Sequence, residues 1–394
     1  MSVQSLLTPS VITKETLVIL ENNLVAAGKV NRQFENQFVK IGSTLTVRKP
    51  NRFRVVKGAA LQVQNISEPQ TQITINQQAQ VAFQFTSQDL TLTVEEFSDR
   101  YLKPAAAEIA NQIDFDVLTN YNQVFNQVGT PGTPPANFAS LGAIGQRMDE
   151  GAVPQDGRIL ILNPAAYWSL ANAFTGLYVK SVAEGALKGF LANIANFEIY
   201  LDQNVQSQTV GAYAGTPVVN GAGQTGSVLV TNGWTASITG LLNIGDVFTI
   251  AGVFAINPKS RVSTGSLQNF VVQATQNSDS GGNSSLSIYP PITTSGPYQT
   301  VSGSPANLAA ITVRGTASTS YAQNLGFVRD AFGLVTVPLE LPQGVDFGAR
   351  EMYKNISMRI IRAYDINNDV FPCRMDVLYG TSTFYPELAS RLTN

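Results

Sequence analysis

The chain has 394 residues, of which 44% are hydrophobic and 13% charged, and its formal net charge is −2. This length allows two or three folding units with substantial cores. So few charges suit a protein that buries much of its surface against neighbours, and the near-neutral balance argues against sequence-specific DNA binding, because no basic field would hold a phosphate backbone.

The residue types that are missing exclude much catalytic chemistry. The sequence has no histidine, and Cys373 is its single cysteine, so Ser-His-Asp triads, His-ligated metals, thiolate zinc sites and intrachain disulfides are impossible. The sequence shows no secretion-signal pattern near its start and no apolar run of about 18 residues. We therefore expect no cofactor, no membrane contact, and a protein that is made and used in a cytoplasm.

The first predicted element is a short amphipathic helix over residues 12–27, with Gly28 as its stop. Its apolar face includes Leu17 and Leu20, spaced as on one side of a helix. This face could pack on its own subunit or lie on another subunit. In the second case Leu17 and Leu20 are candidate inter-subunit contacts.

Residues 44–86 follow a period of two, with apolar side chains at odd positions, which predicts a long β-hairpin or extended loop. The first arm of this loop is basic. We interpret its basic cluster either as a solvated face or as a surface that meets an acidic neighbour or packaged nucleic acid. The candidate contact residues in this arm are Arg48, Lys49, Arg52, Arg54 and Lys57.

A long helix is predicted to begin after Pro104 and to end at Gly129, because apolar residues recur every three or four positions. A second helix over about 136–149, a buried strand over 158–162, a helix opening at Pro164 and a strand over 197–201 follow. Gly, Ser, Thr and Val dominate residues 216–322, where short apolar runs separated by turns predict a small β-barrel or sandwich.

The last predicted elements are a strand within 331–339 and a hairpin over 356–379, with its turn at 367–369. The fold class that we expect is therefore α+β, an outer domain interrupted by an inserted β module.

Patterns that could carry chemistry have simpler explanations. Gly221 to Gly226 fits the spacing of a dinucleotide-binding loop, but a strand follows instead of the helix that such a site requires. Adjacent carboxylates such as Glu95 and Glu96 cannot share one helix face, so we interpret them as solvated charges or caps. Cys373 lies on the apolar face of a predicted strand, where a buried thiol acts as a small hydrophobe.

A series of segments resembles the coat proteins of tailed bacteriophages, in the branch that carries an inserted β-barrel domain. The segments span almost the whole chain in the expected order, and they are residues 13–24, 47–50, 151–158, 241–252, 324–332, 374–380 and 385–391. The resemblance implies a major-capsid-protein fold with an N-terminal arm, an extended loop, a spine helix, and peripheral and axial domains.

Each implied part has a candidate in the sequence. We assign the arm to 1–43, the extended loop to 44–86, the spine helix, peripheral domain and first axial part to 87–215, the inserted barrel to 216–322, and the return to the core to 323–394. In the family, a charged loop of the insertion joins capsomers, and the candidate loop 276–283 offers only Asp279.

The resemblance implies a non-enzymatic structural protein that assembles in the bacterial host cytoplasm into an icosahedral virion capsid around double-stranded DNA. Its partners would be further copies of itself in hexamers and pentamers, a scaffolding protein, a portal protein and non-specifically packaged DNA. The alternatives are another phage or surface-layer structural protein, a carbohydrate-binding β module, or an enzyme that uses carboxylates.

Overall fold

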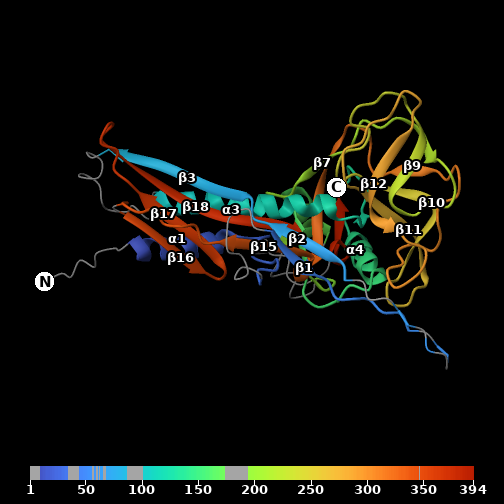
Figure 1. The fold of residues 1–394 in the computed structure, drawn as a ribbon, viewed down its shortest axis with the longest axis horizontal. Coiled ribbons are helices and arrows are strands. Elements are labelled where there is room, and N and C mark those ends of the chain that lie inside the picture. The colour runs from blue at the N-terminus through green and yellow to red at the C-terminus, as the bar shows by residue number, and fades with distance from the viewer. Residues whose placement is uncertain are drawn as a thin grey trace. The chain divides into compact units, whose positions relative to one another are not determined.

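The computed structural model describes residues 9–33, 44–55, 57–58, 61, 63–64, 68–86, 101–173, 194–345 and 347–394. Its mixed helices and strands confirm the predicted α+β class (Figure 1). The chain divides into two compact units, each built from segments far apart in the sequence. The first comprises Met1–Val47, Gln70–Val117 and Phe332–Ser382, and the second comprises Arg48–Pro69, Leu118–Ala331 and Thr383–Asn394.

The first unit is built on a five-stranded sheet. Its strand order is β15 (Phe332–Val337), β18 (Val370–Thr383), β17 (Ile356–Arg362) and β16 (Phe347–Tyr353), and β3 (Gln77–Thr86) also pairs with β18. The antiparallel pairing of β17 with β18 confirms the predicted C-terminal hairpin. Both predicted apolar faces are buried, with the side chains of Ile356, Met358, Ile360, Cys373, Met375, Val377 and Tyr379.

The prediction of one hairpin over 44–86 holds only near its base. Strand β1 (Thr44–Arg48) pairs with β2 (Gln70–Thr74), whereas β3 runs antiparallel along β18 over ten residue pairs. The last ten residues of the predicted loop therefore belong to the sheet. Alternating apolar residues identify the buried face of a strand but not the strand beside it, which is why the sequence pattern could not assign this pairing.

Helix α1 (Pro9–Asn23) packs on β16 and β17 of the same sheet. It begins earlier than predicted and ends before Leu24. The residues after it are held by α3 (Lys103–Leu118), because the Asp114 carboxylate accepts hydrogen bonds from the backbone amides of Val25, at 2.8 Å, and Ala27, at 2.6 Å.

The predicted spine helix is shorter than expected. The α-helix ends at Leu118, a 3₁₀ turn η3 covers Thr119–Gln123, and Gln127–Val128 form strand β4. Tyr121, Val124 and Phe125 stay buried through this change. Their burial explains the error, because the apolar spacing persists although the backbone becomes extended. Residues 87–100, the predicted start of this region, lie outside the described part of the chain.

The central sheet of the second unit has the order β4, β19 (Ala389–Thr393), β14 (Ser320–Val328), β5 (Arg158–Leu162) and β6 (Phe197–Leu201), and β7 (Ser207–Thr209) also pairs with β14. Helices α4 (Phe138–Glu150) and α5 (Pro164–Ala173) pack against it through Leu141, Ile144 and Leu170. These elements confirm the predicted helices at 136–149 and Pro164, the buried strand at 158–162 and the strand at 197–201.

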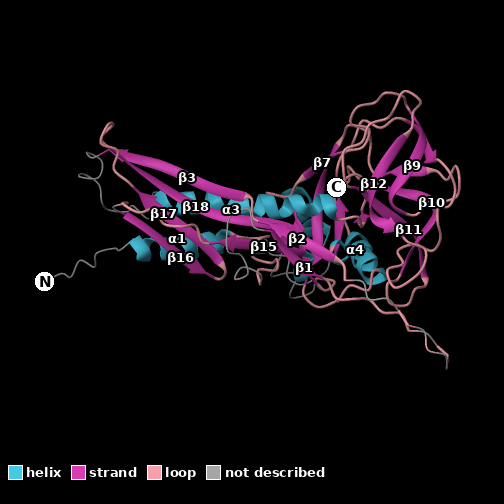
Figure 2. Ribbon diagram, viewed as in Figure 1, coloured by secondary structure: helices cyan, strands magenta, loops and turns pink. Residues whose placement is uncertain are grey.

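A nearly closed barrel is inserted in this unit (Figure 2). Its strands are β8 (Gly215–Val219), β9 (Gly226–Trp234), β10 (Val247–Ile256), β11 (Ser263–Val272), β12 (Ser284–Ile292) and β13 (Ile311–Val313). The two ends of the sheet approach each other where the Val219 amide donates to the Ala309 carbonyl at 3.0 Å. The barrel prediction is confirmed, while the boundaries 216 and 322 stay predictions.

Candidate assembly surfaces

The two apolar candidates in the N-terminal helix are core residues. Leu17 and Leu20 are both 0% exposed, and α1 lies on β16 and β17 of its own chain. A completely buried side chain has no surface to offer a second subunit. Of the two possibilities, the structure therefore shows that these leucines pack within their own subunit. We no longer assign them to an interface.

Three of the basic candidates at the base of the extended loop have partners within their own unit. Arg52 forms an ion pair with Glu387 at 2.7 Å, and the ammonium group of Lys49 lies 4.8 Å from the ring centroid of Tyr385. Arg48 pairs with Glu68 at 3.4 Å, but both side chains are largely exposed, so this pair contributes little.

A tyrosine of the barrel completes the attachment of the loop base. The Tyr298 hydroxyl donates to Asn51 Oδ1 at 2.8 Å and accepts from the Arg52 amide at 3.3 Å. We call these contacts of Lys49, Asn51 and Arg52 the base clamp. Burial lowers the pKa of Lys49, although the nearby Glu387 carboxylate opposes that change. The base clamp therefore holds the base of the loop against other residues of the second unit.

Beyond the base clamp, the loop exposes apolar side chains. Phe53 is 66% exposed, Val55 89%, Leu61 90% and Val63 82%. All four occupy odd positions, the alternation expected of an extended strand with one apolar face. Arg54 and Lys57, the two remaining basic candidates of this arm, are also exposed. Among the described residues, this is where large apolar groups are most open to solvent.

The carboxylate of Asp279 organises its own turn in the barrel. Its Oδ1 atom accepts from the backbone amides of Gly281 and Asn283, each at 2.8 Å, and its Oδ2 accepts from the Asn283 side chain at 3.0 Å. These hydrogen bonds lower the pKa of Asp279, that of the Asn283 side chain most strongly. Gly282 has φ +72°, and a Cβ atom there would lie 2.2 Å from the Trp234 carbonyl oxygen. Asp279 is exposed and thus accessible to another subunit, but its first role is to shape this turn.

Sequence reasoning missed a buried polar network between the barrel and the sheet beside it. Arg391 of β19 donates to the Val124 carbonyl at 2.7 Å and to the Gly245 carbonyl at 2.8 Å. Asp246 accepts from the Gly211 amide at 2.9 Å and from the Gln208 side chain at 2.8 Å. We call Tyr121, Gln208, Asp246 and Arg391 the junction network, since Tyr121 donates to Gln208 at 2.6 Å.

Charges in the junction network are buried at an energetic cost that hydrogen bonds offset. Burial lowers the pKa of Arg391 to about 10, with Tyr121 and Asp246 opposing the shift. Burial also raises the pKa of Asp246, against the hydrogen bonds that it accepts from Gly211 and Asn243. The network joins the 3₁₀ turn that follows the spine helix, strand β19 and the barrel in one compact unit.

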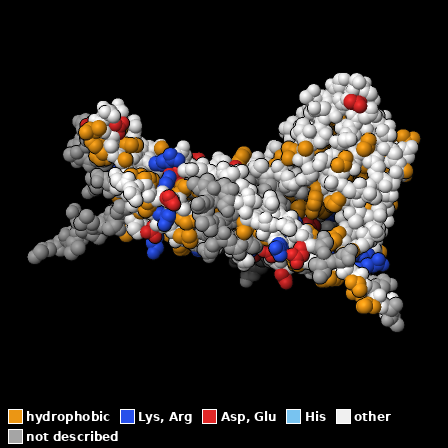
Figure 3. All heavy atoms as spheres, viewed as in Figure 1, with side chains coloured by type: hydrophobic (Ala, Val, Ile, Leu, Met, Phe, Trp, Pro, Cys, Tyr) orange, Lys and Arg blue, Asp and Glu red, His pale blue; other side chains and the backbone are white. Residues whose placement is uncertain are grey.

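The outer face of the barrel carries few charges. Between residues 215 and 313 the charged residues are Asp246, Lys259, Arg261 and Asp279. Figure 3 shows mainly neutral groups over this part of the molecule, with scattered hydrophobic side chains. A nearly neutral surface repels a second copy only weakly.

The remaining patterns with possible chemistry are structural where the chain is described. Gly221, Gly223 and Gly226 all have positive φ; the first two lie in the turn before strand β9, as the sequence predicted, and Gly226 begins that strand. Cys373 is buried, and burial raises its pKa to about 11. Within the described ranges, no cluster of three acidic or cysteine side chains is placed to hold a metal ion. No helix there is both long and apolar enough to cross a bilayer.

The sequence matches a family described as "P22 coat protein - gene protein 5" over residues 1–392. No curated protein sequence matches it. Among solved structures, one from Mycobacterium phage Che8 is 12% identical, with a TM-score of 0.50 over 94% of this chain and 90% of that chain. At this identity the likeness shows a shared fold.

Two further solved structures are similar. The capsid of Ralstonia phage GP4 is 8% identical, with a TM-score of 0.47 over 92% of this chain and 86% of that one. The CUS-3 coat protein I-domain is 28% identical, with a TM-score of 0.19 over 25% of this chain and 96% of that one.

Proposed function

Because this chain belongs to the P22 coat protein family and is a major capsid protein, we propose that its copies close into an icosahedral shell of hexamers and pentamers around double-stranded DNA. The observation that best supports self-assembly is the exposed apolar face of the extended loop, from Phe53 to Val63. An isolated subunit gains nothing from exposing these side chains, whereas a neighbour that covers them removes apolar surface from water.

We further propose that the loop lies across an adjacent subunit. The base clamp fixes one end of the loop, so that only its distal part needs to be ordered on binding. Each such contact is weak by itself. A closed shell repeats it around every subunit, and the repetition makes the assembly stable.

The remaining partners follow from family membership. A scaffolding protein would guide assembly in the bacterial cytoplasm, and a portal protein would occupy one vertex. With a net charge of −2 the subunit has no general attraction for nucleic acid, so we propose that DNA is confined by the shell and touched non-specifically.

Electron microscopy of the purified chain, alone and with a candidate scaffold, tests the proposed shell. We expect icosahedral particles, whereas tubes, flat lattices or a persistent monomer under all conditions would contradict the proposal. Removal of residues 50–70 tests the loop separately. Normal and stable shells from that deletion would show that the loop does not hold neighbours together.

A further inference from the structure

A cavity of about 520 Å³ lies in the second unit between the barrel, the end of α4 and the base of the extended loop. Its volume falls in the range of sites that hold small ligands or a few side chains of a partner. Part of its wall is apolar and aromatic, with Phe125, Ile256, Tyr289 and Pro290 among its lining residues. The rings of Phe125 and Tyr289 lie 5.7 Å apart between centroids.

The lining also carries an unbalanced positive charge. Of its charged residues, Arg147 pairs with Glu150 at 3.3 Å and Arg52 pairs with Glu387 at 2.7 Å. The other two are Lys259 and Arg261, and in the described part of the chain no carboxylate forms an ion pair with either. The cavity therefore has two surplus positive charges beside an apolar surface.

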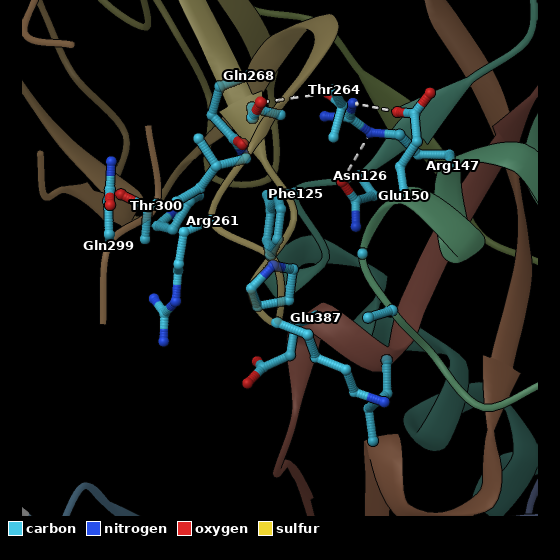
Figure 4. A pocket seen from close by; sticks show the side chains of 18 of the residues that line it. Phe125, Asn126, Arg147, Glu150, Arg261, Thr264, Gln268, Gln299, Thr300 and Glu387 are labelled. Atoms are coloured by element: carbon cyan, nitrogen blue, oxygen red, sulfur yellow. Dashed lines mark hydrogen bonds and ion pairs between the residues drawn. The ribbon is translucent and has the colours of Figure 1, made fainter. Parts of the chain in front are cut away.

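The placement of these two residues is unusual for this barrel. Lys259 and Arg261 are its only basic residues between positions 215 and 313, and both line the same cavity from one tight turn. Figure 4 shows the Arg261 side chain extending into the open space toward which Glu387 also points. Burial and the nearby charges of Arg52 and Arg54 lower the pKa of Arg261. A guanidinium group held near two others gains from any anion that enters.

The turn is built so that it presents its charges in a fixed arrangement. Asn257 Oδ1 accepts from the amides of Lys259, at 2.9 Å, and Ser260, at 3.0 Å. The Asn257 side chain also donates to the Glu150 carbonyl at 3.0 Å, which ties the turn to α4. Arg261 has φ +62°, a strained conformation for a residue with a side chain. Preorganised charges bind a ligand with less loss of entropy.

We propose that this cavity binds an acidic peptide segment of a protein partner, with carboxylates at Lys259 and Arg261 and a large apolar side chain against Phe125 and Tyr289. A free phosphate would satisfy the charges but leave the apolar wall in water. The extended loop of a second copy is the wrong occupant, because its exposed arm carries Arg54 and Lys57 and has the same sign as the cavity. The cavity therefore takes a different occupant from the loop, although Phe53, the first residue of the exposed apolar loop face, also lines it.

Binding of a labelled peptide to the full-length chain tests the proposal. The probe is the fluorescein-labelled hexapeptide Glu-Phe-Glu-Glu-Phe-Glu, followed by fluorescence anisotropy. We expect saturable binding that weakens with salt, and that weakens further when Gln replaces every Glu or when Ser replaces every Phe of the peptide. The variants Arg261→Gln and Lys259→Gln should each weaken binding about tenfold. The matched control Arg329→Gln, at an exposed arginine outside the cavity, should bind as the unmodified chain does.

Two measurements keep the result from being ambiguous. Thermal unfolding without peptide should give Arg261→Gln a Tm close to that of the unmodified chain, because the loss of repulsion from Arg52 and Arg54 offsets the loss of the 3.4 Å hydrogen bond to the Gly296 carbonyl. A clearly lower Tm would assign Arg261 to folding and overturn the proposal. Failure of the acidic peptide to saturate at millimolar concentration, or unchanged binding by Arg261→Gln, would also overturn it. Tighter binding of inorganic phosphate or of a single-stranded oligonucleotide at the same residues would assign the site to phosphate groups instead.

Discussion

The junction network and the distal part of the extended loop both depart from the usual distribution of side chains, but in opposite directions. The junction network buries charged and polar groups and gives two hydrogen bonds to Arg391 and three to Asp246. The loop exposes apolar side chains such as Val55 and Leu61 and attaches only at its base. The first arrangement stabilises a single subunit, whereas the second becomes favourable only when another molecule covers it. Stability and assembly are therefore carried by different residues of this coat protein.

Replacement of the buried arginine tests the first half of this comparison and should have the largest effect. Arg391→Met leaves the carbonyls of Val124 and Gly245 without their donor and removes the positive charge near Asp246. We expect a loss of about 3 kcal/mol in the free energy of unfolding, measured with urea. Arg391→Lys keeps the charge but lacks the planar guanidinium group. Its free energy of unfolding should lie between those of Arg391→Met and the unmodified chain. Equal stability of all three proteins would show that the junction network does not stabilise the subunit.

Charges on the loop test the second half. The double variant Leu61→Asp with Val63→Asp should assemble poorly, because a neighbour would have to desolvate two carboxylates, each at a cost of a few kcal/mol. Its Tm as a subunit should not change, since both side chains are more than 80% exposed. Val228→Asp, at a 53% exposed valine of the barrel, is the matched control. A fall in Tm for the double variant with intact assembly would reverse our assignment.

The base clamp connects the exposed loop to the folded second unit. Tyr298→Phe removes the hydroxyl that joins Asn51 and the Arg52 amide, which should cost about 1 kcal/mol or less at this partly exposed site. Hydrogen exchange of the Arg52 amide should become faster, and shells should form more slowly because the loop is less preorganised. Tyr364→Phe, which removes another exposed hydroxyl, controls for the chemistry of the substitution. Unchanged exchange at Arg52 would mean that the loop is held by other contacts.

The smallest effect concerns the turn at Asp279. Its folded-state pKa is lowered, so the carboxylate stabilises the turn above the unfolded value of 3.8 and loses that contribution as the pH falls below it. Asp279→Asn should remove this pH dependence. Amide exchange at Gly281 and Asn283, compared between neutral and acidic solution, measures the change. If the unmodified turn keeps the same protection in acid, these hydrogen bonds do not depend on the charge.

The local sequence pattern predicted many of the helices and strands but not which distant strands pair with each other. The hairpin around residues 367–369 and the barrel strands follow from alternation and turn residues close in sequence. The pairing of β3 with β18 joins segments about three hundred residues apart, and alternation says nothing about such a partner. The end of the spine helix was misplaced because Tyr121, Val124 and Val128 keep a helical spacing, although the backbone passes through a 3₁₀ turn and becomes extended from Val124.

The candidate contact residues also separate into those whose setting follows from local sequence and those whose setting depends on distant segments. The extended conformation of the loop follows from its alternating pattern, whereas the burial of Leu17 and Leu20 depends on a sheet formed by distant strands. Arg391 was missed because one arginine in a short strand resembles a surface residue until the fold surrounds it. Lys259 and Arg261 did leave a signal, since they are the only basic residues in a long neutral stretch.

The position of β19 between β4 and β14 sets an order of events during synthesis. The barrel draws its strands from one continuous stretch, residues 215–313, which is synthesised before residues 389–393. The central sheet cannot close at that stage. Strands β4 and β14 must wait for residues 389–393, so the central sheet stays incomplete until those residues have been synthesised.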